Sequence, residues 1–123
     1  MYRHIVLFRF DPKTSEDDRL RATEAIAKMA ETVPVVQALT VGQGASGDPP
    51  NFDLVVEVDL DRPEDLPAFL AADGHVSAWT DVVQPMVTEV AVVDYNVGAY
   101  QPVDLVMASP ETRTGDQALP VSQ

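Results

Sequence analysis

The sequence contains no cysteine, which excludes disulfide bonds, thiolate catalysis and thiolate metal sites. Long apolar runs are also missing. The opening stretch "MYRHIVLFRF" interrupts its apolar residues with Arg3, His4 and Arg9, so it is too short a run for a signal-peptide core, and no other run reaches the length of a membrane span. We therefore expect a cytoplasmic protein that does not bind membranes.

Basic side chains are scarce beyond residue 28. Arg62 is the single basic residue between 29 and 98, a stretch rich in Asp and Glu, and the whole chain has a net charge of −12. Such a field repels phosphate groups, so nucleic-acid binding is not expected. With 123 residues, 46% of them hydrophobic, the chain is long enough for one folded domain with a modest core.

Residue spacing predicts six main elements and one further short helix. Residues 2–10 alternate between two faces, which is typical of a strand, whereas the apolar positions after Ser15 follow helical spacing until Pro34. The predicted elements are a strand at 2–10, a helix from Ser15 to Val33, strands at 35–41 and 52–60, a helix at 61–72, a short helix at 75–83, and a strand at 87–97.

This order, βαββαβ, predicts an α+β ferredoxin-like fold, with a four-stranded antiparallel sheet and helices on one face. The domain would cover residues 1–97, and residues 98–123, rich in Pro, Ser, Thr and Gly, would form a mobile C-terminal tail. The sheet face without helices would still carry apolar side chains, a combination that favours burial against a second copy. We therefore predict a homodimer, through Ile5, Leu7, Val55, Ala91 and Val93.

Two further motifs have structural interpretations. The stretch "GQGASG" at 42–47 matches a dinucleotide-binding pattern, but Pro49 and Pro50 lead directly into the next strand, and no helix follows to receive a pyrophosphate. We interpret it as a hairpin loop. The carboxylates in and after the third strand lack the tight loop of a calcium site and are interpreted as a solvated or interface rim. These are Asp53, Glu57, Asp59 and Asp61.

The two histidines are the candidate functional groups. His4 could be a satisfied core residue and His75 a simple helix start, yet both could reach the space between sheet and helices. An apolar pocket with convergent titratable groups is typical of a ligand site. The remaining walls of this predicted pocket are Val6, Phe8, Val56, Phe69, Val90 and Val92.

Three segments give the chain a familiar pattern: "YRHIVLFRFDPKTSED", the helical His75, and the closing strand "VAVVDYNV". Together they resemble the stress-responsive A/B barrel domain (Dabb) family over about residues 1–97. The resemblance implies a dimeric α+β barrel and no required cofactor. It also implies a structural magnesium ion held by backbone carbonyls at the end of the first helix, which correspond here to Ala30, Val33 and Val36.

One branch of that family, the olivetolic acid cyclases, performs cofactor-free aldol chemistry. The resemblance places His4 and His75 at its two active-site histidines, and Phe69 where that branch has a tyrosine. Tyr2 is the candidate to supply the missing hydroxyl, because strand alternation places Tyr95 on the opposite face. We expect a protein that binds a small, largely apolar molecule. One alternative is a cofactor-independent cyclase or lyase in which His75 is the general base. The other is a purely structural stress protein that binds no ligand.

Overall fold

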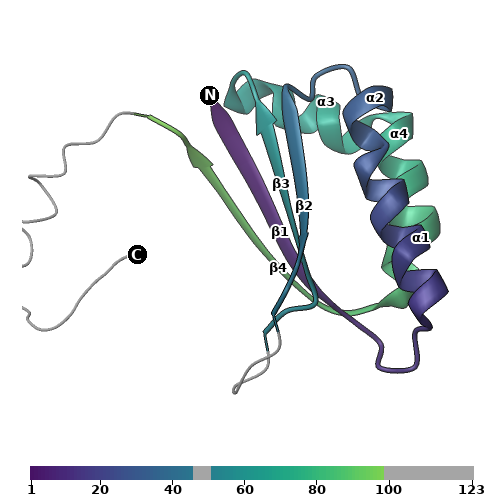
Figure 1. Cartoon of the computed structure of the whole chain (residues 1–123). Helices are drawn as coiled ribbons and strands as arrows, with labels where there is room; N and C mark the ends of the chain where they lie inside the picture. The colour runs from purple at the N-terminus through teal and green to yellow at the C-terminus, as the bar shows by residue number, and fades with distance from the viewer. Residues whose placement is uncertain (46–50, 99–123) are drawn as a thin grey trace, which may run out of the picture.

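The computed structural model describes residues 1–45 and 51–98, so the end of the "GQGASG" stretch (residues 46 and 47) and the predicted tail from residue 99 onward lie outside the described residues. The fold is ferredoxin-like, as predicted. A four-stranded antiparallel sheet has the order β2-β3-β1-β4, and the helices lie against one of its faces (Figure 1). The elements are β1 (Tyr2–Phe10), α1 (Glu16–Ala27), α2 (Met29–Thr32), β2 (Ala38–Gln43), β3 (Leu54–Leu60), η1 (Pro63–Asp65), α3 (Leu66–Ala71), α4 (Asp73–His75), η2 (Val76–Val83), η3 (Gln84–Met86) and β4 (Val87–Asn96).

Several element boundaries differ from the prediction. The first helix breaks at Lys28 into α1 and α2, and β2 starts at Ala38 instead of residue 35. The reason for the later start is a turn after Pro34, in which the Val36 N–H donates to the Val33 carbonyl at 3.1 Å. The predicted short helix begins earlier, at Asp73, and continues as the π-helix η2, a form that is uncommon and often marks functional sites.

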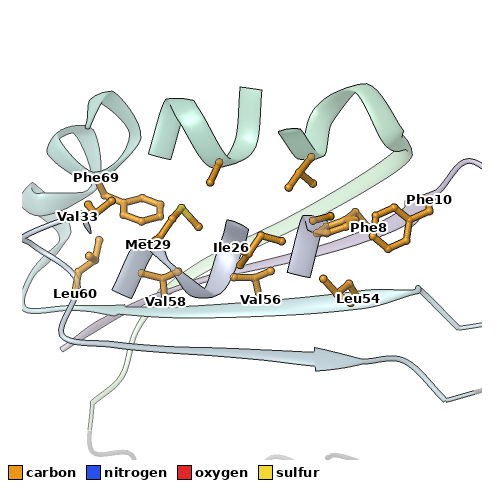
Figure 2. Close-up of a cluster of buried hydrophobic side chains, with 13 residues drawn as sticks. Phe8, Phe10, Ile26, Met29, Val33, Leu54, Val56, Val58, Leu60 and Phe69 are labelled. Atoms are coloured by element: carbon orange, nitrogen blue, oxygen red, sulfur yellow. The ribbon is translucent and has the colours of Figure 1, made fainter. Parts of the chain in front are cut away.

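The core lies between the sheet and the helices (Figure 2). All four inward residues of β3 are buried, and so are Phe8 and Phe10 of β1, which meet edge to face at 5.4 Å between ring centroids. Ile26 and Met29 pack onto them from the first helices. Burial of a large apolar side chain contributes about 1.5–3 kcal/mol each. This cluster therefore fixes the helical layer over β1 and β3.

Strand β4 extends beyond this layer. Its inward residues Val90 and Val92 have the parity of Phe8 and Val6, their cross-strand partners, yet they are 44% and 53% exposed. Figure 1 shows β4 bending away from the helices at the edge of the sheet. The side of β4 that faces the helices is thus lined by apolar side chains, and none of the described helices packs directly onto them.

The opposite sheet face carries the predicted apolar band. Leu7 is the cross-strand neighbour of Val55 on β3 and of Ala91 on β4. Ile5 is the cross-strand neighbour of Val93, which is 55% exposed. No helix of the described residues lies on this face (Figure 1).

Ion pairs flank the apolar band. Arg3 donates to Asp59 at 2.7 Å and approaches the Tyr95 hydroxyl at 3.4 Å, so Tyr95 lies on this face, as alternation predicted. Glu57 lies 3.9 Å from Arg3, whereas Asp53 accepts from the Phe10 N–H at 2.8 Å. The predicted carboxylates therefore have different contacts. Glu57 and Asp59 lie near Arg3 on this sheet face, whereas Asp53 connects β1 to the start of β3 through its hydrogen bond.

Gly74 allows α4 to lie against α2, and a side chain there would clash. A Cβ at this position would lie 2.5 Å from the Thr32 Oγ1 and 2.9 Å from the Val33 Cγ2. We predict that Gly74→Ala lowers the free energy of unfolding by about 1–3 kcal/mol through overpacking. Gly42→Ala is the matched control, because its Cβ would meet only Val55 at 3.4 Å. Urea unfolding of both variants measures the effect, and equal losses would contradict the prediction.

Candidate functional site

A pocket of about 230 Å³ lies between the inner sheet face and the helices. Every predicted pocket residue except Tyr2 lines it, including both histidines. Residues that the sequence analysis had not assigned complete the wall: three apolar core residues, Leu70 and Trp79. The full lining is His4, Val6, Phe8, Ile26, Met29, Val56, Val58, Phe69, Leu70, His75, Trp79, Val90 and Val92.

His4 is held by a carboxylate on the neighbouring strand. It is buried in the middle of the β1 ladder, where its cross-strand partner is Asp94 of β4. The His4 Nδ1 lies 2.5 Å from the Asp94 Oδ1. An ionised carboxylate only accepts, so Nδ1 is the donor in this bond. Nε2 is then the ring nitrogen of His4 that remains for a ligand.

His75 has a different environment. It closes α4, and its Nδ1 is buried without a hydrogen-bond partner among the described residues. Burial lowers the pKa of the His75 imidazole below its ordinary value of 6.5; the Leu70 backbone opposes this change, and the nearby His4 adds to it. Because protein atoms cover Nδ1, a ligand in the pocket would meet Nε2. His75 therefore offers a mainly neutral imidazole at neutral pH.

Phe69 connects the two histidines. Its ring centroid lies 5.7 Å from that of His4 and 4.8 Å from that of His75. Phe69 is almost fully buried, so it fixes the relative positions of the imidazoles. It brings no hydroxyl, and among the residues that the structure describes, no serine, threonine or tyrosine lines the pocket. Proton transfer in this pocket would therefore depend on the two imidazoles.

The placement of Tyr2 is a correction to the sequence analysis. Tyr2 shares the inward face with His4, but it lies at the end of β1, where it pairs with Leu60 and Asn96 and packs against the edge of the core. It is not among the lining residues. Alternation predicted its face but not its distance from the pocket, and the role of its hydroxyl stays a prediction.

Among the residues that the sequence analysis missed, Asp94 and Trp79 each carried a signal in the sequence. Asp94 follows Val90 and Val92 at the same two-residue period, which places it on the inward face of β4. Trp79 follows His75 by four residues on one helical segment, a spacing that puts both on one side. Trp79 lines the pocket and meets Phe8 edge to face at 5.7 Å.

The predicted magnesium site involves the carbonyls of Ala30, Val33 and Val36. The Val33 carbonyl already accepts the Val36 N–H at 3.1 Å, which leaves one lone pair for a cation. Magnesium binding there stays a prediction. Across residues 1–45 and 51–98, no cluster of three or more His, Cys, Asp or Glu side chains is arranged to hold a metal.

None of the helices in the described ranges has the length and apolar character needed to cross a membrane.

Comparisons with known proteins agree with this architecture. The sequence profile of the stress-responsive A/B barrel domain (Dabb) matches residues 2–97, whereas no curated protein matches the chain. Among solved structures, a dimeric ferredoxin-like protein of unknown function from Thermobifida fusca is 25% identical with a TM-score of 0.68, covering 78% of this chain and 90% of that one.

Two other solved structures show the same fold at lower identity. A Dabb family protein from Mesorhizobium loti is 15% identical with a TM-score of 0.68, covering 80% of this chain and 97% of that one. A hydroxynitrile lyase from Passiflora edulis is 15% identical with a TM-score of 0.71, covering 82% of this chain and 96% of that one.

The lowered pKa of His75 predicts a pH dependence of stability. In the unfolded chain this imidazole binds protons more readily than in the fold, so the free energy of unfolding should fall as the pH decreases below about 6.5. Urea unfolding between about pH 5 and 8 measures this slope. His75→Phe should reduce the slope, since it removes the titrating group. Equal slopes in the wild type and the variant would contradict the prediction.

Proposed function

The chain belongs to the stress-responsive A/B barrel domain family, and we propose that it binds a small, largely apolar molecule between sheet and helices. The observation that carries this proposal is the meeting of both histidines in one otherwise apolar pocket. Pockets of this composition, with a few convergent polar groups, are the usual form of small-molecule sites. In the proposed complex the Nε2 atoms of His4 and His75 are the polar contacts.

A cofactor-independent enzyme is the second candidate, of the aldol cyclase or lyase type. The His4–Asp94 pair favours it, because a carboxylate that orients an imidazole is a recurrent feature of acid–base sites. The likeness to a hydroxynitrile lyase also supports this candidate. In a cyanohydrin cleavage His75 would take the hydroxyl proton, the carbon–carbon bond would break to form the aldehyde carbonyl, and the electron pair would leave with cyanide. His4 would orient the developing carbonyl.

We further propose that the protein acts as a homodimer in which the sheet faces without helices meet. The apolar band of Ile5, Leu7, Val55, Ala91 and Val93 supports this arrangement, because a monomer would leave it in water. Similar solved proteins from Thermobifida fusca and Bacteroides fragilis are described as dimeric. The two pockets would then lie on the outside of the dimer, each under its own helices.

Ligand binding can be tested with signals that the chain supplies itself. The protein has two histidines and one tryptophan, and all three line the pocket. We predict that a small uncharged ketone shifts the ring NMR signals of His4 and His75 together. His75→Phe should weaken binding up to about tenfold, the contribution of one hydrogen bond. Val76→Ala, an exposed neighbour outside the lining, is the control. Shifts spread over the whole surface would contradict the proposal.

Turnover separates the two candidate functions. If the protein is an enzyme, His75→Phe should reduce turnover of a cyanohydrin or a β-polyketone by about 10²–10⁴-fold, far more than it weakens binding. A binding protein should bind such compounds without converting them. Assays of aldehyde release and ring closure with both proteins measure this difference, and wild-type activity that the variant retains would remove His75 from the mechanism.

The dimer is tested on the apolar band. We predict that Val93→Glu shifts the protein to monomers, because the new carboxylate would be buried against the second copy. Ala27→Glu on the exposed side of α1 adds the same charge and should leave the dimer intact. Sedimentation velocity at several concentrations gives the mass in each case. A wild-type protein that sediments as a monomer would contradict the proposal.

A further inference from the structure

We propose that the pocket selects uncharged ligands and rejects carboxylates and phosphates of the same size. This inference deepens the proposed function and rests on it. The ligand class would be an apolar body with one uncharged polar end, such as a ketone, an amide or an alcohol. The inference follows from three features of the described residues: the absence of a cation in the lining, the carboxylate behind His4, and the surroundings of His75.

Within residues 1–45 and 51–98, no lysine or arginine lines the pocket, and the wall is apolar apart from the two imidazoles and the Trp79 indole. Arg3 is next to His4 in sequence, but strand alternation directs it to the other face, where it is bound to Asp59 at 2.7 Å. An anion entering this wall would lose water and meet no permanent positive charge. Transfer of an unpaired charge into apolar surroundings is strongly unfavourable.

A carboxylate contacts the pocket wall from behind His4. Asp94 contacts the His4 Nδ1 at 2.5 Å, and its side chain is 28% exposed, so it is partly desolvated. A positive charge on His4, where present, would be balanced by this carboxylate. An anionic ligand at the His4 Nε2 would therefore meet a pair with no net positive charge, and at reduced dielectric the repulsion by Asp94 is only weakly screened.

His75 could receive an anion only in its protonated form. Its apolar contacts oppose that form: Phe69 lies against the ring at 4.8 Å, and burial lowers the pKa of the imidazole. In the described part of the chain, the titratable groups that face His75 across the pocket are His4 and, behind it, Asp94. Trp79 adds a single N–H donor, which suits an uncharged oxygen as well as a carboxylate.

The size of the pocket sets the scale of the ligand. A cavity of 150 Å³ holds benzene, so about 230 Å³ corresponds to a ligand of roughly ten non-hydrogen atoms. Cyclohexanecarboxamide and cyclohexanecarboxylate are isosteric, differ in charge, and do not absorb where tryptophan is excited. They are therefore matched probes for the pocket, with the fluorescence of Trp79 as the readout.

The experiment titrates the full-length protein with both probes at neutral pH and follows Trp79 fluorescence and the histidine ring signals. We expect the amide to bind at least about tenfold more tightly than the carboxylate, from the unfavourable desolvation of charge. A carboxylate that binds as tightly as the amide overturns the inference and leaves the proposed pocket in place. If neither the two probes nor the ketone binds, the proposed function fails, and this inference fails with it.

Asp94→Asn tests the source of the selectivity. The variant removes the negative charge and should bring the two affinities closer together, whereas Asp81→Asn, an exposed position on η2 outside the lining, removes the same charge and should leave their ratio unchanged. Equal ratios in all three proteins would overturn the role of Asp94. If Asp94→Asn does not fold by circular dichroism, the wild-type comparison of the two probes still decides the inference.

Discussion

The helical layer packs on β3 and β1 and does not extend over the edge strand β4, so the sheet is wider than the helices that cover it. Val90 and Val92 consequently stay about half exposed, although they point to the same side as the fully buried Phe8. The pocket lies between the edge of the hydrophobic core and the uncovered inner side of β4. A wider helical layer would have buried these valines as ordinary core residues and closed the space that holds both imidazoles.

The two histidines reach this pocket from different elements of the fold. His4 belongs to the central ladder of the sheet, and the bond to Asp94 adds a second restraint across to β4. His75 lies where the helix changes to the wider π form, seated by the close contact of Gly74 with α2. Functional groups on regular elements are held more accurately than groups on loops. The orientation of the His4 imidazole is therefore fixed by its bond to Asp94, whereas the His75 imidazole has a lowered pKa.

Most of the pocket was predictable from the sequence because alternation assigns each strand residue to a face. That rule placed His4, Val6, Val56, Val90 and Val92 correctly on the inward side. It did not give the lateral register between β1 and β4, which depends on packing across the sheet and which brings Asp94 opposite His4. Alternation also does not predict how far a residue lies from the pocket. For that reason Tyr2 was predicted to line the pocket, although it is not among the lining residues.

The helical part of the site was less predictable than the strands. Spacing indicated a helix near His75, but the start at Asp73 depends on Gly74 packing against Thr32 and Val33, a contact between segments far apart in sequence. The π geometry of η2 likewise depends on tertiary packing, since local preferences favour an ordinary helix.

Phe69 decides how the two candidate functions relate to one another. A hydroxyl at this position would stand between both imidazoles and could pass a proton from one side of a ligand to the other. The phenyl ring of Phe69 contacts both imidazoles, with ring-centroid distances of 5.7 Å to His4 and 4.8 Å to His75. It contributes only apolar surface. An enzyme built on this pocket would have to assign proton removal and carbonyl orientation to two separate nitrogens, whereas a binding protein needs only the shape and the two contacts. The same geometry thus makes fewer demands for binding than for catalysis.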